Sequence, residues 1–82
     1  MIKGQLNNIK ENSSNIVVGV VTSRFNEPVT SKMRQGALNV LEEFGIGNLF
    51  DISVPGAYEI PMAAKWLVEK KHCDAVIALG AV

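Results

Sequence analysis

Apolar residues along this chain form three short runs, separated by two segments with a helical period. Residues 16–21 are a continuous β-branched run and residues 74–80 are again apolar throughout, whereas residues 49–54 alternate between apolar and polar. Continuous apolar runs are typical of strands covered on both faces in a parallel sheet. Over residues 27–44 and 58–71, apolar side chains recur at helical spacing, as on helices that bury one face. The sequence therefore predicts the order β-α-β-α-β.

The residues at the ends of the two helical segments support these limits. Asn26 suits the N-cap of the first helix and Gly45 suits the position just past its last turn. Pro61 fits the second helix only if it lies in the first turn. The residues that we expect to face the sheet are Met33, Ala37, Leu38, Leu41 and Phe44 on the first helix, and Ile60, Ala63, Ala64, Leu67 and Val68 on the second.

The chain divides into a polar tail over residues 1–15, with a short edge strand expected near residues 2–6, and a partial α/β domain over residues 16–82. Parallel strands joined by helical crossovers give a three-layer sheet. Two helices are few for three strands, the last of which is apolar on both faces, so we expect the C-terminal part of the domain to be missing and the chain to be a fragment.

Charge and cysteine content remove several classes of protein. Eight Lys and Arg balance eight Asp and Glu, so the formal net charge is zero. A protein that binds nucleic acid or an anionic membrane would need a basic surplus. The single Cys forms no intrachain disulfide, and no Cys or His cluster has zinc spacing. With no signal peptide and no apolar run of about 20 residues, we expect a cytoplasmic protein without a membrane span.

Ligands of open parallel sheets bind outside the carboxyl ends of the strands. In this chain those ends lead into residues 23–26, residues 54–59 and residues 80–82, which should meet at one edge of the sheet. Phe25 is an aromatic residue in a polar loop, where its ring either stacks on a planar heterocycle or closes the top of the core. Arg24 either pairs with a carboxylate or phosphate or is a solvated surface charge.

The loop after the second strand is the stronger candidate for a binding site. Gly56 allows a ligand to approach the backbone closely, because it has no Cβ. Ala57, Tyr58 and Glu59 then present first-turn N–H groups that no helical carbonyl satisfies, and the Glu59 carboxylate can accept from ligand hydroxyls. The alternative is that Glu59 only caps the helix. The chain has no phosphate-binding glycine loop and no Cys/His or Ser/His pair that indicates a nucleophile with its base.

Four blocks of sequence resemble the 6,7-dimethyl-8-ribityllumazine synthase family. They are Val-Val-Thr-Ser-Arg-Phe-Asn at 20–26, Gly-Ala-Leu at 36–38, Val-Pro-Gly-Ala-Tyr-Glu-Ile-Pro at 54–61 and Asp-Ala-Val-Ile-Ala-Leu-Gly-Ala-Val at 74–82. Their order and spacing match the family over roughly residues 14 to 82, the N-terminal half of the family's chain.

The resemblance implies a flavodoxin-like fold, a pentamer or a larger shell, and an enzyme of riboflavin biosynthesis without a cofactor. The family condenses 5-amino-6-ribitylaminouracil with 3,4-dihydroxy-2-butanone 4-phosphate. On this basis Phe25 would stack on the pyrimidine and Asn26 would line its pocket. Ala57, Tyr58 and Glu59 would hold the ribityl chain and the uracil edge. The remaining expected ring contacts are Ala81 and Val82.

The family's next motif, Ile-Arg-Gly-Glu-Thr followed by a His, would lie beyond Val82. In the family this motif binds the phosphate substrate and supplies the proton-transfer residue, so the resemblance implies no catalytic residue in this chain and no activity from the chain alone. His72 is not a substitute, because it precedes the third strand, at the opposite edge. Two alternatives remain: a non-catalytic truncated product, and a flavodoxin-like module that binds a flavin or a pyrimidine.

Overall fold

The computed structural model describes residues 15–81, which form three strands and two α-helices in the predicted order. The edge strand expected near residues 2–6 lies outside the described residues. The elements are β1 (Val17–Ser23), α2 (Glu27–Glu43), β2 (Asn48–Val54), the short 3₁₀ helix η2 (Ala57–Glu59), α3 (Ile60–Lys70) and β3 (Ala75–Leu79).

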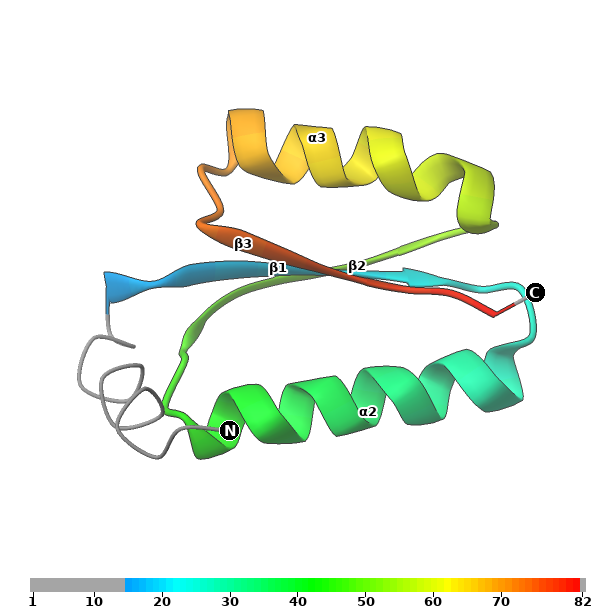
Figure 1. The fold of residues 1–82 in the computed structure, drawn as a ribbon, viewed down its shortest axis with the longest axis horizontal. Helices are drawn as coiled ribbons and strands as arrows, with labels where there is room; N and C mark the ends of the chain where they lie inside the picture. The colour runs from blue at the N-terminus through cyan, green and yellow to red at the C-terminus, as the bar shows by residue number, and fades with distance from the viewer. Residues whose placement is uncertain (1–14, 82) are drawn as a thin grey trace, which may run out of the picture.

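The sheet is parallel, with β1 in the centre and the strand order β2-β1-β3. The chain therefore moves to one side of β1 for β2 and crosses back over β1 to reach β3. Because such crossovers are right-handed, the two connecting helices fall on opposite faces of the sheet. Figure 1 shows this arrangement, with α3 above the sheet and α2 below it. The predicted three-layer α/β architecture is confirmed, and the arrangement is flavodoxin-like.

The core has two halves because alternate residues of β1 point to opposite faces. On the α2 side, Val18 and Val20 pack with Leu41 and Ile46. On the α3 side, Val21 packs with the fully buried Leu67 and with other apolar residues of α3 and β2. A strand buried on both faces explains the continuous apolar run in the sequence.

Two residues expected on the apolar helix faces are exposed, so these two predictions were wrong. Met33 on α2 is 37% exposed and Val68 on α3 is 49% exposed. The buried residues of the helices are Thr30 and Leu41 in α2 and Leu67 in α3. Neither Met33 nor Val68 belongs to the apolar clusters that pack against the sheet.

The ends of α2 confirm the predicted positions, although the N-terminal mechanism differs. After the last turn, Gly45 has φ 76°, and its N–H donates to the Glu42 carbonyl at 2.9 Å. The Ile46 N–H donates to the Leu41 carbonyl at 3.0 Å, which completes a Schellman motif. Asn26 is the N-cap, with φ 62°, but its side chain makes no cap hydrogen bond. Pro61 lies in the first turn of α3.

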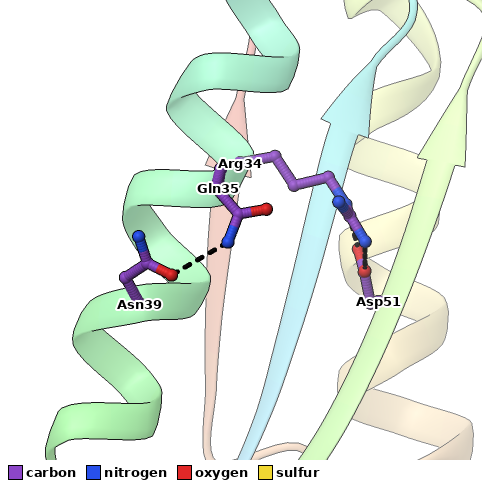
Figure 2. Close-up of polar contacts among 4 residues, drawn as sticks. All are labelled: Arg34, Gln35, Asn39 and Asp51. Carbon is purple, nitrogen blue, oxygen red and sulfur yellow. Dashed lines mark hydrogen bonds and ion pairs between the residues drawn. The ribbon is translucent and has the colours of Figure 1, made fainter.

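An ion pair joins α2 to the outer strand β2. Figure 2 shows the Arg34 guanidinium reaching from α2 to the Asp51 carboxylate, to which it donates through Nε and Nη2. This carboxylate raises the pKa of Arg34, chiefly through the hydrogen bond. The next residue, Gln35, donates through Nε2 to Oδ1 of Asn39, one turn further along the helix surface, at 2.8 Å. The pair is therefore a lateral contact between a helix and the edge of the sheet.

Candidate functional site

The loops that follow the three strands meet at the carboxyl edge of the sheet. This edge is at the right of Figure 1, where the starts of α2 and α3 and the end of β3 lie together. A Cβ built on Gly80, just after β3, would lie 3.9 Å from Cβ of Ser23 and 4.0 Å from Cβ of Ala57. Residues from all three loops therefore pack against one another, as the strand-end rule predicts.

A pocket of about 250 Å³ opens between these loops. It is lined by Phe25, Gly56, Ala57, Tyr58 and Ala81. Four of these are residues that the sequence analysis selected for a binding site, and Gly56 is the glycine expected to allow close approach. The structure thus brings most of the candidate residues to one cavity, although the first and last of them, Phe25 and Ala81, are 56 positions apart in the sequence.

The two aromatic residues of this pocket are open to solvent. Phe25 is 60% exposed and Tyr58 is 98% exposed. Phe25 therefore does not close the top of the core, which was the alternative interpretation of this residue. An exposed ring beside a small apolar cavity can offer its face to a planar group.

Glu59 performs the capping role that the sequence analysis weighed against ligand binding. Its Oε2 accepts a hydrogen bond from the Gly56 N–H at 3.0 Å, which is the return half of a capping box. An ionised carboxylate has four lone-pair sites on its two oxygens, so the cap leaves acceptor capacity for a further donor. Glu59 also lines a separate hollow of about 390 Å³ together with Ile52, Val54, Pro55, Met62, Ala63 and Trp66.

The remaining candidates flank this pocket or lie outside the description. Asn26 follows Phe25 at the start of α2, with its carbonyl accepting from the N–H groups of Val29 and Thr30. Its side chain is not part of the pocket lining. Val82 lies outside the described residues. Arg24 donates through Nη1 to Oγ and to the carbonyl oxygen of Ser53, at 3.1 and 3.4 Å.

Ser23 is a residue of this edge that the sequence analysis did not select. Its side chain is fully buried, and its Oγ accepts a hydrogen bond from the Phe25 N–H at 3.2 Å. A serine at the end of a strand can accept a hydrogen bond from the N–H two residues later, which forms a side-chain turn. That pattern was visible in the sequence, but burial of the hydroxyl was not.

Other reactive side chains lie away from the pocket. His72 follows α3 with φ 55°, just before β3, at the opposite edge of the sheet. Cys73 is buried, as expected, and burial raises the pKa of its thiol, with a smaller contribution from the charge of Asp74. A larger hollow of about 570 Å³, beside Gly45 and Gly47, lies near the amino end of β2 and contains none of the candidate residues.

Residues 15–81 hold neither a candidate metal site nor a candidate membrane span. No group of three or more His, Cys, Asp or Glu side chains in this range is arranged to hold a metal ion. None of the helices in the same range is long and apolar enough to cross a membrane.

Comparison with known proteins gives the same family name from a family model and from individual relatives. A model of the family described as 6,7-dimethyl-8-ribityllumazine synthase matches residues 15–82. A protein of that name from Prochlorococcus marinus (strain MIT 9215) is 47% identical over 77 residues, covering 87% of this chain and 49% of the relative. One from Thermococcus gammatolerans is 45% identical over 65 residues, covering 79% of this chain and 42% of the relative. The chain thus spans about half the length of the curated relatives it matches.

Proposed function

Because the chain belongs to the 6,7-dimethyl-8-ribityllumazine synthase family, we propose that it acts in riboflavin biosynthesis by binding 5-amino-6-ribitylaminouracil in the pocket beside Phe25. The observation that carries this proposal is the convergence of Phe25, Ala57, Tyr58 and Ala81 on one cavity, next to an exposed aromatic face. In the reaction of the family, this substrate condenses with 3,4-dihydroxy-2-butanone 4-phosphate.

In the proposed complex, the pyrimidine ring stacks on Phe25, and Asn26 lines the pocket beside it. The ribityl chain runs along the loop after β2, where Ala57 and Tyr58 present backbone groups. Its hydroxyls donate to the Glu59 carboxylate, which has acceptor capacity beyond its bond to Gly56. Ala81 closes the pocket from the end of β3. The proposal adds Val82 to the same wall.

We further propose that this chain supplies the pyrimidine and ribityl half of a larger site. The groups that bind the phosphate co-substrate and transfer protons would then belong to the half of the relatives that the chain does not span. On this proposal residues 15–81 contribute binding and no catalytic residue, no cofactor is required, and the chain by itself is inactive. Assembly as a pentamer or a multiple of it, and a cytoplasmic location, are parts of the same proposal.

Calorimetric titration of the 82-residue chain with 5-amino-6-ribitylaminouracil tests this function. Phe25→Ala should weaken binding by about 5- to 150-fold, because stacking of one base contributes about 1–3 kcal/mol. Phe25→Leu keeps apolar volume but removes the π face, so it should restore only part of the affinity. Trp66→Ala is the matched control, because Trp66 is an exposed aromatic residue outside the pocket lining.

The Glu59 part of the proposal needs its own variant. Glu59→Gln should weaken binding of 5-amino-6-ribitylaminouracil but not that of the same pyrimidine without its ribityl chain, since the carboxylate is proposed to contact only hydroxyls. Glu43→Gln, an exposed residue at the far end of α2, is the control for the loss of one charge. Unchanged affinity in both Phe25→Ala and Glu59→Gln would disprove the proposed pocket.

A further inference from the structure

The position of Phe25 is set by residues that do not line its pocket. The ring is 60% exposed, so packing around the ring does little to hold it. A stacking residue contributes most when its orientation is fixed before the ligand arrives, because ordering it during binding costs free energy. The contacts of the backbone around Phe25 therefore decide how well the ring is preorganised.

Ser23 anchors the backbone of Phe25 by a hydrogen bond. Its Oγ accepts from the Phe25 N–H at 3.2 Å, and the Ser23 side chain is fully buried. The acceptor is thus fixed in the core while the donor carries an exposed ring. A Cβ built on Gly80, just after β3, would lie 3.9 Å from Cβ of Ser23, so Ser23 lies beside the segment that carries Ala81.

Arg24 ties the Phe25 loop to the loop after β2. Its backbone N–H donates to the Val54 carbonyl at 2.7 Å, one residue beyond the end of β1. Its Nη1 contacts both Oγ and the carbonyl oxygen of Ser53. These contacts involve the last two residues of β2, which precede the segment that carries Ala57 and Tyr58. The Phe25 loop is thus hydrogen-bonded to the strand that leads into the other side of the pocket.

Asn26 completes the support from the other side of Phe25. Its carbonyl accepts from Thr30 Oγ1 at 3.3 Å, as well as from the first N–H groups of α2. Thr30 is only 1% exposed, so this second anchor is also buried. Phe25 is therefore an exposed ring between two anchored neighbours.

From this arrangement we propose that Ser23 and Arg24 are positioning residues, which fix the Phe25 ring at the mouth of the pocket and thereby raise affinity for a planar heterocycle that neither residue touches. This inference rests on the proposed function, because it names what prepares the proposed stacking residue. It also gives Arg24 a role other than pairing with a substrate carboxylate or phosphate.

A double-mutant cycle distinguishes positioning from a general structural role. Ser23→Ala removes the acceptor, and it should weaken binding of 5-amino-6-ribitylaminouracil by about three- to tenfold, the effect of one hydrogen bond. In the Phe25→Ala background the same substitution should change affinity by less than about twofold, because no ring remains to be positioned. Ser31→Ala, an exposed serine on α2, is the matched control.

Arg24→Gln provides a second, independent cycle. It should also weaken binding when Phe25 is present and change it little in the Phe25→Ala background, and it tests the positioning role if Ser23→Ala does not fold. Amide exchange gives a readout without ligand: Ser23→Ala should speed exchange of the Phe25 amide by about three- to tenfold. It should leave amides near the middle of α2 unchanged.

The possible outcomes separate the two proposals. If Phe25→Ala weakens binding but Ser23→Ala and Arg24→Gln do not, the positioning role is wrong while the pocket stands. If Ser23→Ala weakens binding equally with and without the Phe25 ring, Ser23 is merely structural and the inference is overturned. If Phe25→Ala has no effect, or the chain does not bind the probe at all, the proposed function fails and the positioning role fails with it.

Discussion

Gly19 of β1 faces the α3 side chain Leu67, and replacing this glycine with alanine tests how tightly α3 is packed. A Cβ at Gly19 would lie 2.7 Å from Leu67 Cδ1 and 3.2 Å from Cys73 Sγ. Favourable carbon–carbon contacts lie at about 3.5–4.0 Å. Leu67 is fully buried and Cys73 is 7% exposed, so neither side chain can turn into solvent to relieve the overlap. The Leu67 side chain, the strand or α3 must therefore shift within the core.

The cost follows from two opposing effects. Adding a methyl group to a packed core costs about 1–3 kcal/mol. Alanine also restricts the unfolded chain more than glycine does, which returns about 0.4–1 kcal/mol. The difference is about 0–2.6 kcal/mol, and the 2.7 Å overlap with buried Leu67 places Gly19→Ala in the upper part of this range, as a loss in the free energy of unfolding. A chain of this length has about 4–12 kcal/mol of stability in total, so the change is large enough to measure.

Urea unfolding, followed by Trp66 fluorescence and far-ultraviolet circular dichroism, measures this change. Gly36→Ala is a control with the same chemistry and the opposite expected sign. Gly36 lies within α2, and no atom would come within 4 Å of its added Cβ. Alanine should therefore stabilise the chain by up to about 1 kcal/mol through helix propensity. Equal effects of the two substitutions, or a stable Gly19→Ala variant, would refute the packing described for α3.

Two further predictions concern buried polar groups. Thr22 is 5% exposed, and its Oγ1 has no hydrogen-bond partner within residues 15–81. Thr22→Val should therefore raise the free energy of unfolding, measured in urea, by about 1–3 kcal/mol. A loss of stability would show instead that the hydroxyl is satisfied. Burial and, to a lesser degree, Asp74 raise the pKa of the Cys73 thiol, so the folded chain holds this proton more tightly than the unfolded chain. The contribution of this thiol to the free energy of unfolding is fully present below its unfolded pKa of about 8.5. It is lost as pH rises through the higher folded pKa. Cys73→Ala should flatten the decline of stability above pH 8.5 in thermal unfolding, and an unchanged decline would contradict the assignment.

The order and type of the main elements could be predicted from sequence because each depends on local periodicity. The run at 16–21 lies almost entirely within β1 (Val17–Ser23), and the segment at 27–44 is α2 (Glu27–Glu43). The 3₁₀ turn η2 (Ala57–Glu59) was not predicted and was assigned instead to the start of the second helix. A single turn has too few residues for a periodic pattern, and its form depends on the hydrogen bond from Gly56 to Glu59.

Contacts between distant segments could not be predicted, because they depend on three-dimensional register. Arg34 and Asp51 are 17 residues apart, and their ion pair needs α2 to lie beside the edge strand. The hydrogen bond from Arg24 to Ser53 depends on the pairing of β1 with β2. By contrast, the pocket could be anticipated in outline, because parallel strands always bring their carboxyl ends to the same edge.

The most direct test of the proposed pocket is a two-dimensional ¹H–¹⁵N NMR titration of the chain with 5-amino-6-ribitylaminouracil. We expect the largest shift changes at the amides of Phe25, Gly56, Ala57, Tyr58 and Ala81, the residues that line the cavity. These changes should be lost in Phe25→Ala. Shift changes that gather around the larger hollow at the amino end of β2 instead, or none at all, would contradict the account.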